Sequence, residues 1–99
     1  MRVKLVRDKV PLKDDRETIQ AANSPAGRVA LLINKMHEEV GEIAMDPWDP
    51  EEYADLFEAV SELMRLNGVS MLEVENAVWA KRRAVGGFRQ GMVLSRPRA

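Results

Sequence analysis

The 99-residue chain contains no cysteine, which excludes disulfide bridges, zinc–thiolate sites and thiol catalysis. No apolar run approaches the ~18 residues that a membrane-spanning helix requires. The first ten residues, MRVKLVRDKV, are charged where a signal peptide has its apolar segment. From these absences we expect a cytoplasmic protein without a membrane partner.

The net charge of −1 conceals a strong segregation of charge along the chain. Residues 1–35 carry a net charge of +4, residues 36–75 carry −11, and residues 76–99 carry +6 with no acidic side chain. An acidic centre between basic ends suits a metal site flanked by phosphate-binding groups. The alternative is a charge pattern that serves only solubility.

Length and composition predict one globular domain over residues 1–99, with an N-terminal arm at 1–24 and a tail at 89–99. Apolar residues make up 45% of the chain and charged residues 31%, which is typical of a folded domain with a core of modest size. Val3 and Leu5 hint at a short extended piece. Residues 13–24 fit either a loop or a marginal helix over 15–22.

Three helix-start signals predict an all-α fold. Ser24-Pro25 is an N-cap followed by proline, and it opens a helix to about Met45. Asp49-Pro50, with Glu52 completing a box-like pair, opens a second helix to about Leu66. Ser70 and Glu73 form a capping box that opens a third helix over 71–84.

Apolar residues recur at helical spacing in all three segments. The inward-facing stripes that this spacing predicts are Val29, Leu32, Ile33, Met36, Val40 and Ile43 in the first helix, Tyr53, Leu56, Phe57, Val60 and Met64 in the second, with Leu63 at its border, and Met71, Val74, Val78 and Trp79 in the third. A short connection predicts that the first two helices form an antiparallel hairpin. Their stripes are wider than one small chain covers, so we expect a homodimer or homotetramer that completes a four-helix-bundle-like core.

Two pairs of acidic residues flank the turn of this hairpin. Glu39 and Glu42 stand three residues apart, as do Glu52 and Asp55, and such residues share a helix face. The hairpin would bring the four carboxylates together, and their repulsion requires a divalent cation or shifted pKa values. The pattern predicts a Mg²⁺ site in which Mn²⁺ can substitute. The alternative is that the acids are simply solvated.

Three motifs, in order, resemble one known family. Glu38-Glu39-x-x-Glu42 followed by Glu52-x-x-Asp55 resembles the EExxE…ExxD signature of the all-α nucleoside triphosphate pyrophosphohydrolases, which include MazG-like enzymes and phosphoribosyl-ATP pyrophosphohydrolase. The segment KLVRDKVP at 4–11 is similar to the KLVRDKIP start of one MazG-like branch, and KRRAVGGF at 81–88 is similar to its K…GGF close. The nine residues between Glu42 and Glu52 are fewer than is typical of the family.

The resemblance implies Mg²⁺-dependent hydrolysis between the α and β phosphates of a nucleotide, giving a monophosphate and pyrophosphate. It implies metal ligation by Glu39, Glu42, Glu52 and Asp55. Glu38 would orient water or bind a further metal ion, so Glu38 and Glu39 are the candidate catalytic residues. Metal ions would neutralise the phosphates and activate a water whose proton a carboxylate accepts.

Further residues are candidates for contacts with the nucleotide. Lys4, Arg7, Lys9 and Lys81 suit phosphate binding, although each could be an ordinary surface cation. Trp48 in the turn suits stacking on a base, or equally an interface. Two other functions remain open: a non-catalytic metal- or nucleotide-binding module of the same fold, and an interaction protein whose basic tail contacts nucleic acid. Of these partners we expect the nucleotide and not nucleic acid.

Overall fold

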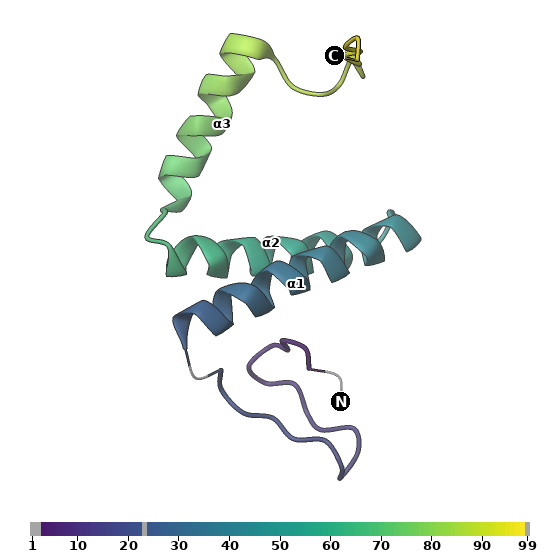
Figure 1. The fold of residues 1–99 in the computed structure, drawn as a ribbon, viewed down its shortest axis with the longest axis vertical. Coiled ribbons are helices and arrows are strands. Elements are labelled where there is room, and N and C mark those ends of the chain that lie inside the picture. The colour runs from purple at the N-terminus through teal and green to yellow at the C-terminus, as the bar shows by residue number, and fades with distance from the viewer. Residues whose placement is uncertain (1–2, 23, 99) are drawn as a thin grey trace. The chain divides into compact units, whose positions relative to one another are not determined.

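The computed structural model describes residues 3–22 and 24–98, and in these ranges it contains three α-helices and no strand (Figure 1). The helices are α1 (Pro25–Met45), α2 (Pro50–Leu66) and α3 (Met71–Val85). The all-α prediction is confirmed. No helix in the described part of the chain is long and apolar enough to cross a membrane. The chain divides into two compact units, Met1–Val69 and Ser70–Ala99, which are described in turn.

The start of α1 follows the predicted cap. The hydroxyl oxygen of Ser24 accepts a hydrogen bond from the Gly27 amide at 3.0 Å, and Pro25 occupies the first helical position. Proline is tolerated there because its missing N–H would have no partner within the helix. The helix ends where the Asp46 amide donates to the Glu42 carbonyl.

The second helix also begins at its predicted cap, with one difference in its hydrogen bonds. The Asp49 carboxylate accepts from the Glu51 amide at 2.9 Å, whereas the Glu52 side chain makes no reciprocal bond among the described residues. The predicted box-like pair is therefore wrong, and Glu52 is available for other contacts. Gly68 ends the helix with a φ of 68°, a conformation that glycine adopts without a Cβ clash.

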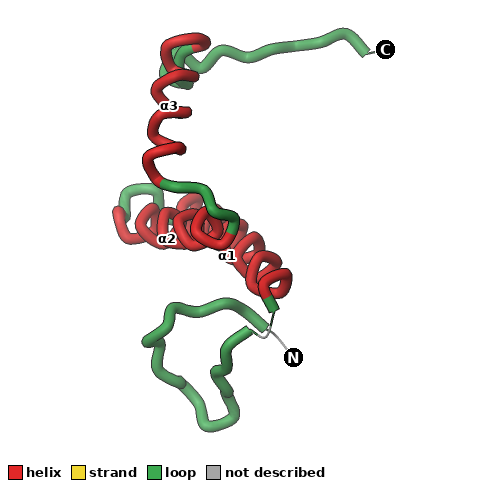
Figure 2. Tube along the Cα trace, turned by 90° about the vertical axis from the view of Figure 1, so that its left-hand side faces the viewer, coloured by secondary structure: helices red, strands yellow, loops and turns green. Residues whose placement is uncertain are grey.

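The N-terminal unit is built on the α1–α2 hairpin. The two helices run antiparallel, as the colours of Figure 1 show, and pack against each other; Figure 2 shows them side by side, nearly end-on. Leu32 and Ala59 are its buried apolar residues. The small side chain of Ala59 lets the helices approach closely. Around the turn, the Tyr53 hydroxyl donates to the Pro47 carbonyl at 2.9 Å.

The predicted apolar stripes only partly face the hairpin interface. Val29, Met36 and Ile43 on α1 are half-buried, as are Leu56 and Val60 on α2. Four other stripe residues remain exposed: Ile33, Val40, Tyr53 and Phe57. The prediction that these four face inward is wrong, because the helices meet along the line of Leu32, Glu39 and Ala59, at one border of the stripes.

Residues 3–22 form an arm without helix or strand, which Figure 2 draws as a loop beside the two helices. The extended piece hinted at by Val3 and Leu5 is not a strand, and the loop alternative holds for the described residues of 13–24. Within the arm, hydrogen bonds from Arg16 lower the pKa of Asp14 to about 2. The arm is thus partly organised by its own charges.

The C-terminal unit consists of α3 and an irregular tail. The predicted capping box is present: the Glu73 amide donates to the Ser70 hydroxyl, and the Ser70 amide donates to the Glu73 carboxylate, each at 3.1 Å. Of the four predicted inward residues only Val74 is half-buried; Met71, Val78 and Trp79 are exposed. The expectation that Trp79 belongs to a core is wrong; the Arg82 guanidinium lies over its ring at 5.6 Å.

Candidate metal centre

Three acidic side chains from the two helices converge at the hairpin interface. Oxygen atoms of Glu39, Glu52 and Asp55 lie within 4.8 Å of one another. Two ligands of one Mg²⁺ ion lie at most about 4.2 Å apart, because each is ~2.1 Å from the metal. Small side-chain adjustments would bring the three carboxylates to that spacing, and carboxylate oxygens are the donors that this cation prefers. The donor set therefore fits a hard divalent cation.

Glu39 is the buried member of this group, with 4% of its surface exposed. A buried carboxylate requires a compensating charge, and Lys35 on the preceding turn supplies it, with Nζ at 3.1 Å from Glu39 Oε1. The same ammonium group lies 3.5 Å from Glu38 Oε2. Burial acts to lower the pKa of Lys35, but the hydrogen bond to Glu39 and the two carboxylate charges raise it overall.

Two cations of the arm contact an acid of this group and its neighbour Glu38. Arg7 Nη2 donates to Asp55 Oδ1 at 2.7 Å, and Lys4 Nζ donates to Glu38 Oε1 at 3.2 Å. The hydrogen bond to Asp55 raises the pKa of Arg7. Partial burial acts to raise the pKa of Glu38, but Lys4 and Lys35 together lower it. The arm thus places positive charge against both the α1 and the α2 side of the acids.

Glu52 is the acid in this group whose charge is least compensated. Partial desolvation raises its pKa, and the charges of Glu42, Asp49, Glu39 and Asp55 raise it further. Among the described residues no cation forms an ion pair with Glu52, whereas Glu39 and Asp55 each have one. Added positive charge would therefore be most favourable next to Glu52.

Glu38 and Glu42 lie beside the three-carboxylate group. Both line a cavity of about 460 Å³ between the arm and α1, whose other lining residues are Val3, Lys4, Leu5, Leu31, Asn34 and Lys35. Its walls combine apolar side chains with an amide and two ammonium groups, as ligand pockets of this size do. Glu42, predicted as a fourth ligand, contributes its charge to the group without belonging to the closely spaced set.

The remaining predicted site residues are exposed, and one of them lies in the other unit. Lys9 is exposed in the arm and forms no ion pair with another described residue. Trp48 is exposed at the tip of the turn between α1 and α2. Lys81 is exposed on α3, in the C-terminal unit. The phosphate-binding and stacking roles of these three residues stay predictions.

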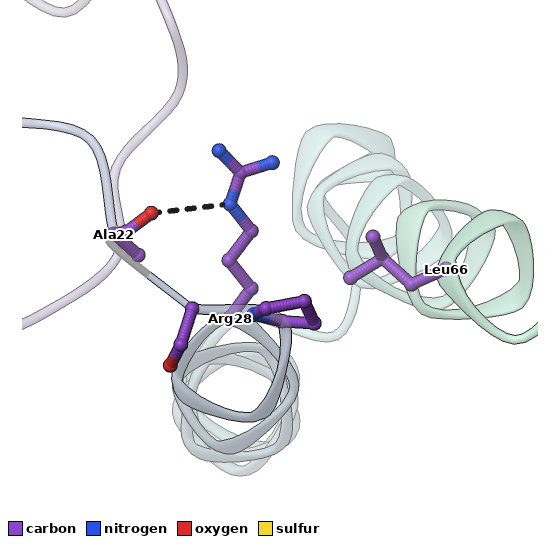
Figure 3. Close-up of a pocket in the computed structure, with 5 residues that line it drawn as sticks. Ala22, Arg28 and Leu66 are labelled. Carbon is purple, nitrogen blue, oxygen red and sulfur yellow. Dashed lines mark hydrogen bonds between the residues drawn. The ribbon is translucent and has the colours of Figure 1, made fainter.

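A second, smaller cavity lies at the other end of the hairpin. It has a volume of about 220 Å³ and is lined by Ala22, Ser24, Pro25, Arg28 and Leu66 (Figure 3). Arg28 Nε donates to the Ala22 carbonyl at 3.4 Å across it. None of its described lining residues is acidic, so it is no candidate for a cation site.

Sequence reasoning overlooked Lys35 as a member of the centre. Its spacing of three residues to Glu38 and four to Glu39 is the signal that predicts ion pairs on one helix face. The contacts of Lys4 and Arg7 with carboxylates were also not foreseen, since these cations were expected to bind phosphates.

Comparison of the chain with models of protein families, with curated proteins and with solved structures finds no match. The resemblance of the three motifs to the pyrophosphohydrolases therefore stays a prediction, and the functional argument rests on the geometry of the carboxylates.

Proposed function

We propose that the chain is a Mg²⁺-dependent nucleotide pyrophosphohydrolase, which cleaves a nucleoside triphosphate between its α and β phosphates. The observation that carries the proposal is the convergence of Glu39, Glu52 and Asp55, from two helices, to within 4.8 Å. Folding brings these acids together although like charges repel, and such a cost in stability is common at sites that serve binding or catalysis.

The charge distribution around the acids supports an anionic substrate. A triphosphate would be repelled by carboxylates alone, but Lys4 and Arg7 reach the same place from the arm. A guanidinium presents several donors in a fork that fits phosphate oxygens. The bound cation would neutralise the phosphates and lower the pKa of a water molecule.

Side chains of the protein would then orient this water molecule and accept its proton. Glu38 lies beside the three-carboxylate group, at the border of the larger cavity. Its carboxylate is a candidate to accept the proton of the bound water. The apolar walls formed by Leu5 and Leu31 would hold the nucleoside while the phosphates face the acids.

The exposed apolar residues of the hairpin support self-association. Ile33 and Val40 on α1, and Tyr53 and Phe57 on α2, lie on the side of each helix away from Asp55 and Glu38 at ~100° per residue. A contiguous apolar surface is a common feature of interaction sites. We infer that this surface packs against a second copy, which would complete a four-helix core.

A nucleotide panel tests the proposed function directly. Pyrophosphate release is measured for the common ribo- and deoxyribonucleoside triphosphates with Mg²⁺, and ³¹P NMR identifies the products. The proposal predicts monophosphate and pyrophosphate from at least one of them, and no turnover with a chelator present. Nucleotide binding without turnover would favour the non-catalytic module. Release of orthophosphate in place of pyrophosphate would contradict the bond assignment.

A further inference from the structure

The acids of the candidate centre are paired with cations that are remote in sequence. Arg7 and Asp55 are 48 positions apart, and Lys4 and Glu38 are 34 apart. Their contacts, at 2.7 and 3.2 Å, join the arm to α2 and to α1. Such pairs are made only when the arm lies against the hairpin, so they belong to the tertiary structure.

Arg7 and a divalent cation would compete for the same carboxylate. A guanidinium held 2.7 Å from Asp55 Oδ1 would repel a second positive charge at that oxygen. Arg7 is also well placed to leave, because its side chain is 56% exposed and exposed ion pairs are weak. Lys4 has the same exposure.

Lys35 differs from these two cations. Its side chain is 21% exposed, and its ammonium group contacts both Glu38 and Glu39 on its own helix. Moving it would leave the buried carboxylate of Glu39 without its ion-pair partner, which is costly. Lys35 is therefore a fixed counter-ion, while the arm cations are exchangeable.

We propose that Arg7 and Lys4 are exchangeable counter-ions, which release Asp55 and Glu38 when a divalent cation binds and then contact the phosphates of the nucleotide. This inference rests on the proposed function and assigns the arm a regulatory part in it. The exchange keeps the charge of the site nearly balanced at each stage: the acids hold either arm cations or a metal ion, and the displaced cations meet the incoming phosphates. Val3 and Leu5 of the arm also line the larger cavity and take no part in these ion pairs.

The exchange predicts that a single variant binds the metal ion more tightly and the phosphate ligand more weakly. Arg7→Gln removes the competitor, so Mn²⁺ alone should bind about threefold more tightly, as measured by electron paramagnetic resonance on the full chain. The same variant loses a phosphate contact, so inorganic pyrophosphate in the presence of saturating Mn²⁺ should bind about tenfold more weakly. Lys4→Gln should show the same two signs with a smaller gain for Mn²⁺, because Lys35 still neutralises Glu38.

Arg16→Gln is the matched control. It removes the same charge from the same arm, and its partner Asp14 is likewise 2.7 Å away, but that pair lies within the arm. This variant should leave both affinities within twofold of the wild type. If the wild type is active but Arg7→Gln binds Mn²⁺ no more tightly than the wild type, the exchange is wrong and the proposed function still stands. A wild type that binds no Mn²⁺ would overturn both.

Discussion

The two sides of the α1–α2 hairpin differ in chemistry: one is acidic and the other is apolar. The carboxylate side carries Glu38, Glu39, Glu52 and Asp55. Three cations of the same unit contact all of these acids except Glu52. The apolar side carries Ile33, Val40, Tyr53 and Phe57, all exposed. Charge on one side is largely balanced within the chain, whereas the apolar surface on the other side is not covered by the N-terminal unit. This difference is the basis for proposing a cation site on the first side and a contact with a second copy of the chain on the other.

The largest expected effect comes from removing one acid of the converging group. Asp55→Asn keeps the size of the side chain but weakens ligation, so pyrophosphate release should fall by at least about 100-fold. Circular dichroism should show an unchanged helix content. Glu75→Gln, which neutralises an exposed acid on α3, is the control and should retain activity. If both variants were similarly active, the acids of the carboxylate side would not be the active site.

The next largest effect concerns the apolar side. Phe57 is 69% exposed, so Phe57→Glu places a charge on the surface that is proposed to pack against a second copy, while the hairpin interface stays intact. The dissociation constant of the oligomer should rise about tenfold or more, as measured by analytical ultracentrifugation. Leu72→Glu is the matched control, since Leu72 is 65% exposed on α3. An oligomer equally weakened by both, or a monomeric wild type, would refute the assignment of this face.

A smaller effect separates the members of the acidic group. A cation at about ten times its dissociation constant stabilises the folded chain by ~1.4 kcal/mol, which raises the melting temperature of a small domain by several degrees. Glu52→Gln should remove most of the shift produced by Mg²⁺. Glu42→Gln should reduce it less, because Glu42 lies outside the closely spaced set. Equal shifts in the wild type and Glu52→Gln, by differential scanning fluorimetry, would contradict this ranking.

The smallest effect is a dependence of stability on pH. The folded-state pKa of Glu52 is raised above its ordinary value of 4.5, so its contribution to stability is complete below that value and is lost as the pH rises through the folded-state pKa. Glu52→Gln cannot ionise and keeps the contribution. With a chelator present, the variant should therefore melt slightly higher than the wild type at pH 7. The two should melt alike at pH 4, and a difference that grows toward acid would show that the sign is wrong.

Repulsion among the acids would suggest that neutralising any of them stabilises the fold, but the ion pairs restrict this expectation. Glu39 and Asp55 lose Lys35 and Arg7 as partners when neutralised. Glu52 loses no such partner among the described residues. The structure thus distinguishes acids that the sequence pattern treats as equivalent.

The helix ends could be predicted because their causes are local. Ser24-Pro25, Asp49-Pro50 and the Ser70–Glu73 box each satisfy amide groups within four residues, so sequence alone shows them. The convergence of acids could also be predicted from the sequence, because two helices joined by a short turn fold back on each other and bring the residues near the turn together. The pattern predicts that four acids converge, and three of them, Glu39, Glu52 and Asp55, do so, whereas Glu42 lies outside the closely spaced set.

The face on which each helix packs could not be predicted in the same way. An apolar stripe shows which residues prefer burial but not which partner buries them, and stripes of this width allow several contact lines. The hairpin uses the border marked by Leu32 and Ala59, where a small residue permits close approach, and leaves Val40 and Phe57 exposed. The contacts of Lys4 and Arg7 also could not be predicted from the sequence, because an irregular arm has no periodicity that fixes its position.

One measurement tests the central claim most directly, namely that the carboxylate side of the hairpin holds a divalent cation. Mn²⁺ binding to the wild type, Asp55→Asn and the Glu75→Gln control is followed by electron paramagnetic resonance without nucleotide. We predict saturable binding to the wild type and the control, and a loss of at least about tenfold in affinity in Asp55→Asn. Equal affinity in all three proteins, or no binding to the wild type at millimolar Mn²⁺, would contradict the account.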